Sequence, residues 1–210
     1  MSLLLVDVAI VGGGFLLGRW IVRTMRARSA GKAPAAADAK EPAAKGNPLQ
    51  GFPCKIGDVL VRAAEGDEAW LAGALVFAEE RPVAALFIAP EAGGDRAIFV
   101  RPSHGADVAG ADVTWLAPVD LRDLPDLGPT GEPPHALEHG GVRYERSRRL
   151  PVKVERIGTG APAVGSQAIV AEYSASGPER LLVVAGSPGP LAWVGLALRD
   201  SEYEVLPGEG

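Results

Sequence analysis

Short apolar runs separated by turn residues make up most of the chain after residue 50. Runs of this kind, bounded by Gly, Pro, Asp or Ser, are typical of β-strands. Residues 152–155 alternate between apolar and polar side chains, as in a strand that buries one face, and no stretch here has convincing amphipathic-helix spacing. We therefore predict a mostly β, antiparallel domain. Its expected strands are residues 59–61, 70–77, 83–88, 97–100, 114–116, 141–144, 152–157, 168–173, 181–185, 191–198 and 203–206.

A proline-rich stretch divides these strands into two sets. Five prolines lie between residues 118 and 134 and bar regular structure there. We predict a first β lobe over residues 51–120, a proline-rich connection over 121–135 and a second β lobe over 136–210, each barrel- or sandwich-like. Similar hairpins occur in both sets, so the lobes are either a duplication or a chance similarity.

The first 28 residues combine an apolar run with a cluster of arginines, which predicts a single transmembrane helix and a basic arm. Residues 3–22 span about 30 Å as an α-helix, the thickness of the hydrocarbon core of a membrane. Four arginines end this segment and no basic residue precedes it, so the positive-inside rule places the N-terminus outside and the folded domain in the cytoplasm. Asp7 and Arg19 lie near the helix ends, where they reach the headgroups, and Trp20 is placed as an interfacial aromatic residue. The predicted anchor comprises Leu3, Asp7, Gly14, Gly18, Arg19, Trp20 and Arg23.

The glycines of this segment allow other interpretations. An apolar run followed by Gly12-x-Gly14 is similar to a dinucleotide-binding fingerprint, but Leu17 stands where the third glycine belongs. No β-branched strand follows it either, so we favour the membrane helix. In that helix, Gly14-x-x-x-Gly18 would let two copies associate into a homo-oligomer, although glycine is also simply common in membrane helices.

Composition and charge support this division of the chain. Aromatic residues make up 6% of the chain, and 27 glycines and 18 prolines argue against a helical bundle. Residues 29–50 are rich in Ala, Pro, Lys and Gly and predict a flexible linker. Residues 1–48 hold seven basic and three acidic side chains, a net charge of +4, whereas the remaining 14 basic and 23 acidic side chains give −9. We therefore expect the basic arm to face anionic lipid and the acidic domain to bind no nucleic acid.

Candidate catalytic and metal-binding chemistry is sparse. His135-x-x-x-His139 with Glu138 has metal-ligand spacing only on a helix, which the flanking prolines and glycines oppose. His104 is the third histidine and has no such companion. The single Cys54 excludes an intramolecular disulfide and suits a reducing compartment; it is either a reactive thiolate beside Lys55 or, as we favour, a small buried side chain. We predict no catalytic residue, no metal site and no cofactor.

One segment concentrates positive charge within the acidic domain. As a hairpin tip it could bind phosphate, anionic lipid or an acidic partner. As a solvated face it would pair with Glu138, Glu145 and Glu155. We also expect Trp70, Trp115 and Trp193 to pack in the core, since they lie in or beside apolar strands. The basic residues of the segment are Arg143, Arg146, Arg148, Arg149, Lys153 and Arg156.

The order of glycines and aromatic residues resembles that of the bacterial domain-of-unknown-function family numbered four-one-seven-eight. The shared features are Gly57-Asp58, Gly141-x-x-Tyr144, Gly158, Gly160, Glu172-Tyr173, Leu181-Leu182, Gly195 and the closing residues 203–208. The resemblance covers roughly residues 53–208. It implies a β-rich bacterial domain and no established catalytic residues.

Two functions from different classes follow. The first, which we favour, is a non-enzymatic adaptor or scaffold, tethered to the bacterial inner membrane, whose cytoplasmic β-domain binds an unidentified partner protein. The second is an enzyme or small-anion-binding module with a site between the two β lobes. A deep pocket between the lobes would favour the second, and a filled interface the first.

Overall fold

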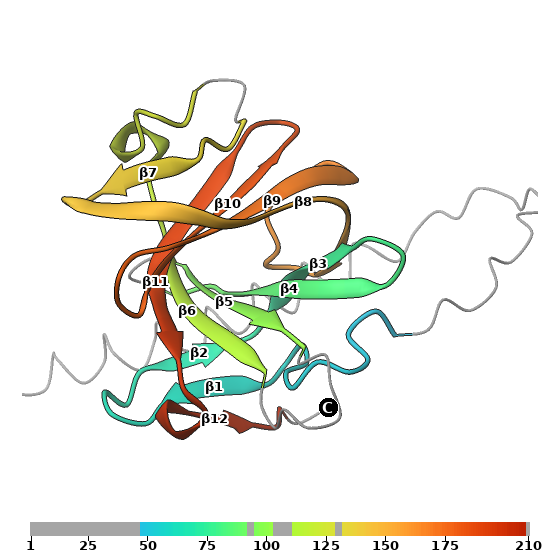
Figure 1. Cartoon of the computed structure of the whole chain (residues 1–210). Coiled ribbons are helices and arrows are strands. Elements are labelled where there is room, and N and C mark those ends of the chain that lie inside the picture. The colour runs from blue at the N-terminus through green and yellow to red at the C-terminus, as the bar shows by residue number, and fades with distance from the viewer. Residues whose placement is uncertain (1–46, 92–94, 103–110, 129–131, 209–210) are drawn as a thin grey trace, which may run out of the picture. The chain divides into compact units, whose positions relative to one another are not determined.

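The structure is a computed structural model that describes residues 47–91, 95–102, 111–128 and 132–208 (Figure 1). The predicted membrane anchor, the basic arm, His104 and nearly all of the predicted linker lie outside these residues. Within the described ranges, no helix is both long enough and apolar enough to cross a membrane.

The described residues form twelve β-strands and two short 3-10 helices, so the predicted antiparallel, mostly β domain is confirmed. The strands are β1 (Val59–Arg62), β2 (Glu68–Trp70), β3 (Gly73–Ala78), β4 (Pro82–Ala89), β5 (Arg96–Arg101), β6 (Asp112–Pro118), β7 (Ala136–His139), β8 (Val142–Gly158), β9 (Gln167–Ser174), β10 (Glu179–Gly186), β11 (Leu191–Leu198) and β12 (Tyr203–Leu206). The 3-10 helices are η1 (Leu121–Asp123) and η2 (Asp200–Glu202).

Eight of the strands close into one antiparallel barrel. Their order is β3-β4-β5-β6-β11-β10-β9-β8, and β8 pairs back with β3. The prediction of two separate lobes is therefore wrong, because β6 of the first set pairs with β11 of the second. Two separate four-stranded sets would each expose two strand edges, whereas a closed barrel pairs them all.

Alternating side chains divide the barrel into an inside and an outside. Inward-facing residues such as Phe77, Leu86, Leu116, Val170 and Trp193 belong to one buried cluster, which fills the barrel. The outward faces of β3 to β6 pack on a second cluster with the strands outside the barrel, and those of β9 to β11 pack on a third with β7 and the segment after β6. Because one face of each strand meets the interior and the other a covering layer, most barrel strands are apolar on both faces.

A small second sheet, in the order β12-β1-β2, covers one side of the barrel (Figure 1). Its middle strand begins after Asp58, a buried carboxylate whose Oδ2 accepts a hydrogen bond from the backbone N–H of Lys55 at 2.8 Å. Its Oδ1 accepts another from the N–H of Gly208 at 3.1 Å. Asp58 thus fastens the end of the described chain to the beginning of the first strand.

The longest strand, β8, extends beyond the body of the barrel. Its first four residues pair with β7 and its last six with β3, while β9 lies along its other edge. The sequence predicted two strands here, over 141–144 and 152–157, because the residues between them are mostly charged. A register shift between Arg146 and Arg148 marks a β-bulge, which changes which side chains of β8 face inward.

Candidate functional site

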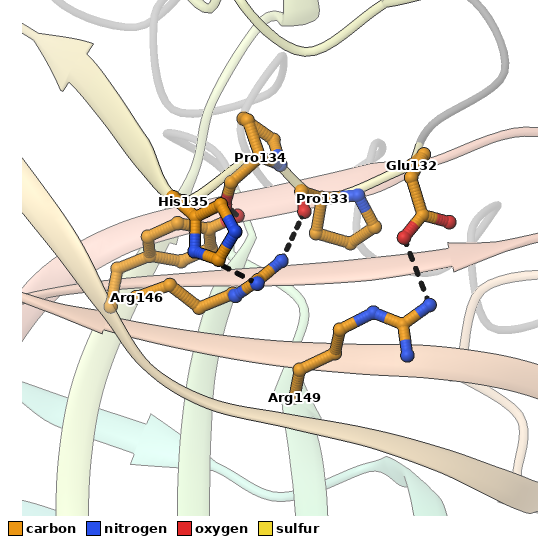
Figure 2. Close-up of polar contacts among 7 residues, drawn as sticks. Glu132, Pro133, Pro134, His135, Arg146 and Arg149 are labelled. Atoms are coloured by element: carbon orange, nitrogen blue, oxygen red, sulfur yellow. Dashed lines mark hydrogen bonds and ion pairs between the residues drawn. The ribbon is translucent and has the colours of Figure 1, made fainter.

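The six basic residues of the positively charged segment lie along β8, and none of them is at a hairpin tip. Arg146 donates from Nη1 to the carbonyl oxygen of Pro133 at 2.5 Å, and its Nη2 lies 3.2 Å from Nδ1 of His135 (Figure 2). Arg149 forms an ion pair with Glu132, with Nη2 and Oε1 2.9 Å apart. These two arginines therefore hold residues 132–135 of the proline-rich connection.

A buried tyrosine of the neighbouring strand holds the same connection. The Tyr173 hydroxyl donates to the carbonyl oxygen of Pro134 at 2.9 Å. Burial, opposed by Arg146 and reinforced by Glu132, raises the pKa of this hydroxyl to about 12, so it stays a donor at neutral pH. Arg146 and Tyr173 are directly opposite each other on β8 and β9, and together they position the segment that leads into β7.

The remaining basic residues of β8 have different neighbours. Arg143 is 3.9 Å from Glu145, an ion pair of two exposed side chains, and Arg156 donates to the carbonyl oxygen of Ala161 at 2.7 Å. Lys153 is exposed, and Arg148 is directly opposite Glu172 of β9. The six basic residues thus have different neighbours, and their possible contact with an anion or a partner stays a prediction.

The other candidate residues have ordinary structural surroundings. Residues 136–139 form a strand, so His135 and His139 are four residues apart on extended chain and not on a helix. Within the described ranges no three metal-ligating side chains gather. Cys54 is fully buried, and burial together with the charge of Asp58 raises its pKa to about 12, which opposes a reactive thiolate and agrees with the favoured interpretation.

The inward-facing side chains change from apolar to charged at one end of the barrel. Arg101 follows Phe99 on the inner face of β5, and Glu172 follows Val170 on β9. Because side chains alternate along a strand, these residues point the same way as the apolar cluster that fills the barrel. The residues that reach this end are Arg101, Asp112, Arg148, Glu172 and Arg180, and we call them the charged mouth.

An ion pair crosses the charged mouth from one side of the barrel to the other. Arg101 contacts Asp112 on the adjacent strand, with Nη2 and Oδ2 2.6 Å apart, and Glu172, with Nη1 and Oε2 3.4 Å apart. β5 and β9 are not neighbours in the sheet, so the second contact spans the barrel. Burial raises the pKa of the Glu172 carboxyl, although Arg101 and Arg148 lower it, and Asp112 raises it further.

Two cavities meet at this end of the barrel. The inner one, of about 140 Å³, lies over Phe99, Leu116 and Leu182 and is bordered by Arg101, Glu172 and Arg180, among others. The outer one, of about 660 Å³, is a groove toward η2. Arg180 borders both, and its Nη1 donates to the carbonyl oxygens of Gly177 and Glu179, each at 2.8 Å.

A row of apolar side chains lies on the outer face of the small sheet. Val59 of β1 is directly opposite Leu206 of β12 on one side and Trp70 of β2 on the other, so all three share a face. Trp70 is 59% exposed and Leu206 is 41% exposed. The prediction that Trp70 packs in the core is therefore wrong, whereas Trp115 and Trp193 are buried as predicted.

Sequence reasoning missed both the charged mouth and the exposed row. The signal for the mouth was a charged residue two positions beyond an inward apolar one, as in Phe99-x-Arg101 and Val170-x-Glu172. That signal is visible along each strand, but only barrel closure brings these side chains together. The sequence predicted one strand over residues 70–77, in which Trp70 joins the buried residues of β3. In the structure Trp70 ends β2, a separate edge strand of three residues.

Comparison with known proteins gives no relative that would identify either site. The resemblance to the domain-of-unknown-function family numbered four-one-seven-eight stays a prediction. No protein-family model, curated protein or solved structure matches this chain.

Proposed function

We propose that this protein is a non-enzymatic adaptor that binds a partner protein through the outer face of the sheet β12-β1-β2. The observation that carries this proposal is the exposure of Trp70, a residue that is 59% exposed on an edge strand. Tryptophan is enriched among the residues that dominate protein–protein binding energies.

The surroundings of Trp70 indicate what kind of partner fits. Trp70, Val59 and Leu206 make one apolar row, and the next row along the sheet places Glu68 and Glu204 on either side of Val61. Both glutamates are exposed. An apolar pocket for the indole, bordered by basic side chains, is the complementary partner surface.

The filled barrel supports an adaptor over an enzyme with a site between the two halves. Phe77 and Leu86 of the first half and Val170 and Leu182 of the second meet in one buried cluster. Sites for metabolites of ordinary size occupy roughly 300–1,000 Å³. The inner cavity, which lies over residues of the barrel interior, has only about 140 Å³, and the groove of about 660 Å³ at the same end lies toward η2 and not in the barrel interior.

We also propose that the N-terminal segment tethers this domain to the inner face of a bacterial membrane. This part of the proposal depends on the sequence alone: the apolar residues 3–22 and the arginines from Arg19 onward. Association of two copies through Gly14 and Gly18 belongs to the same proposal.

Substitution at position 70 tests the adaptor proposal. Full chains carrying Trp70→Ser or the control Leu121→Ser, an exposed leucine of η1, are expressed in bacteria and their cross-linked partners are compared. A partner of the proposed face binds the purified wild-type chain directly, and its affinity falls at least about thirtyfold with Trp70→Ser, the loss typical of a dominant interface residue. Equal binding by both variants would refute the proposed face.

Membrane flotation followed by carbonate extraction tests the tether. The full chain is expected to float with lipid and resist carbonate, whereas a chain that begins at Gly51 is expected to stay in the soluble fraction. A full chain that is released by carbonate contradicts the membrane helix and leaves the adaptor face to be judged separately.

A further inference from the structure

We propose that the charged mouth of the barrel binds a small carboxylate, held by Arg180. This site is separate from the apolar row of the small sheet. It is formed by strands from both halves of the chain, so its geometry depends on closure of the barrel.

The ion pairs of the mouth leave one guanidinium group at the inner cavity without a carboxylate partner. Arg101, Asp112, Glu172 and Arg180 line this cavity, and both carboxylates pair with Arg101. Among the described residues, no carboxylate lies within ion-pair distance of Arg180 or Arg148. Arg180 is therefore the guanidinium group at the inner cavity that is available to pair with a bound anion.

Arg180 is held in place for this role. Its Nη1 donates to two backbone carbonyl oxygens, those of Gly177 and Glu179. Within the described part of the chain its Nε and Nη2 have no hydrogen-bond acceptor, and these two donors have the spacing that matches the two oxygens of a carboxylate. A guanidinium that is already ordered loses less conformational entropy when it binds.

The inner cavity limits the size and the chemistry of the ligand. Its volume of about 140 Å³ corresponds to roughly five water molecules. Phe99, Leu116 and Leu182 offer an apolar wall, while the hydroxyls of Thr114 and Ser147 border the same space. A carboxylate with two or three carbon atoms satisfies both surfaces, whereas phosphate has no apolar part to cover the wall. The outer groove, which shares Arg180, Ala197 and Leu198 with the inner cavity, gives access to it.

Substitution of Glu172 offers a second, independent test of anion binding at this site. Its carboxylate borders the same cavity as Arg180, so a bound anion is repelled by it. The charged groups that face Glu172 are Arg101 from β5, Asp112 from β6 and Arg148 from β8. Removing the negative charge with Glu172→Gln is therefore expected to strengthen binding of an anion by several-fold.

Isothermal titration of the purified full chain tests the proposal with four probes: propionate, acetate, inorganic phosphate and the cation choline. We expect propionate to bind most tightly, phosphate more weakly and choline not at all. Arg180→Gln should weaken propionate binding at least about tenfold. Arg122→Gln, on the exposed η1, is the matched control and should bind as the wild type does, and thermal unfolding of each variant shows that it is folded.

The outcomes separate the proposal from its alternatives. Absence of propionate binding, or equal binding by Arg180→Gln and the wild type, overturns the site. Tighter binding of phosphate than of propionate overturns the carboxylate assignment. Should Arg180→Gln fail to fold, Glu172→Gln decides: stronger propionate binding supports the site, and unchanged or weaker binding refutes it.

Discussion

Replacing Gly195 with alanine should weaken the pairing of β6 with β11, one of the two strand pairings that join the halves of the barrel. Gly195 of β11 is directly opposite Leu116 of β6. A Cβ atom at position 195 would overlap the carbonyl oxygen of Trp115 and lie 2.9 Å from Cα of Leu116. Both are backbone atoms of the partner strand, so no rotamer change relieves the overlap, and β6 and β11 must move apart.

Overpacking of this kind costs about 1–3 kcal/mol of the free energy of unfolding. For a domain of this size, each kcal/mol lowers the melting temperature by about 2–4 °C, so Gly195→Ala should melt roughly 2–12 °C below the wild type. Circular dichroism of the full chain during heating measures the shift.

Gly189→Ala is the matched control for Gly195→Ala. Gly189 lies in the connection between β10 and β11, and a Cβ atom there meets nothing within 4 Å. Its melting temperature should equal that of the wild type or rise slightly, because alanine restricts the unfolded chain. The reasoning is refuted if the two variants melt alike, since the close approach of β6 and β11 would then not constrain position 195.

Three further predictions concern buried or partly buried polar groups. Tyr173→Phe removes the hydrogen bond to Pro134 and should cost about 0.5–1.5 kcal/mol in urea denaturation; a variant as stable as the wild type would show that the bond contributes nothing. Because the pKa of Glu172 is raised on folding, its contribution to stability is complete below pH 4.5 and is lost as the pH rises through the raised pKa. Wild type should therefore lose stability relative to Glu172→Gln over that interval, and parallel stability curves would contradict this sign. Finally, the Cys54 thiol, with a pKa of about 12, should react with an aromatic disulfide reagent at about pH 8 far more slowly in the folded chain than in guanidinium, and equal rates would show an accessible thiolate.

The positions of strands could be predicted where an apolar run is clearly bounded by turn residues. The runs 191–198 and 203–206 coincide with β11 and β12, because each is a mostly apolar run between clear turn residues. The run 70–77 was wrong in one respect, since Leu71 and Ala72 separate β2 from β3. The carbonyl of Leu71 accepts from Gly57, and the N–H of Ala72 donates to Ile88, so these two residues make tertiary hydrogen bonds.

Barrel closure could not be predicted from local pattern. Pairing of β3 with β8 and of β6 with β11 joins residues about 80 positions apart. The residues of one strand do not show which distant strand it pairs with or in which register. The charged mouth depends on the same closure, because Arg101 and Glu172 meet only across a closed barrel. The arginines of β8 were visible in the sequence, but their different surroundings follow from the bulge beside Arg148 and from the position of the proline-rich connection.

The pairing of β1 with β12 has a consequence for biosynthesis. These are the first and the last strands of the described domain, and Val59 is directly opposite Leu206. The small sheet therefore cannot be completed until β12 has left the ribosome, and the outer faces of β3 to β6, which this sheet covers, remain incompletely covered until then. A domain built on such distant pairings is expected to fold slowly and as a single unit, and loss of β12 is expected to expose apolar residues on the outer faces of β3 to β6.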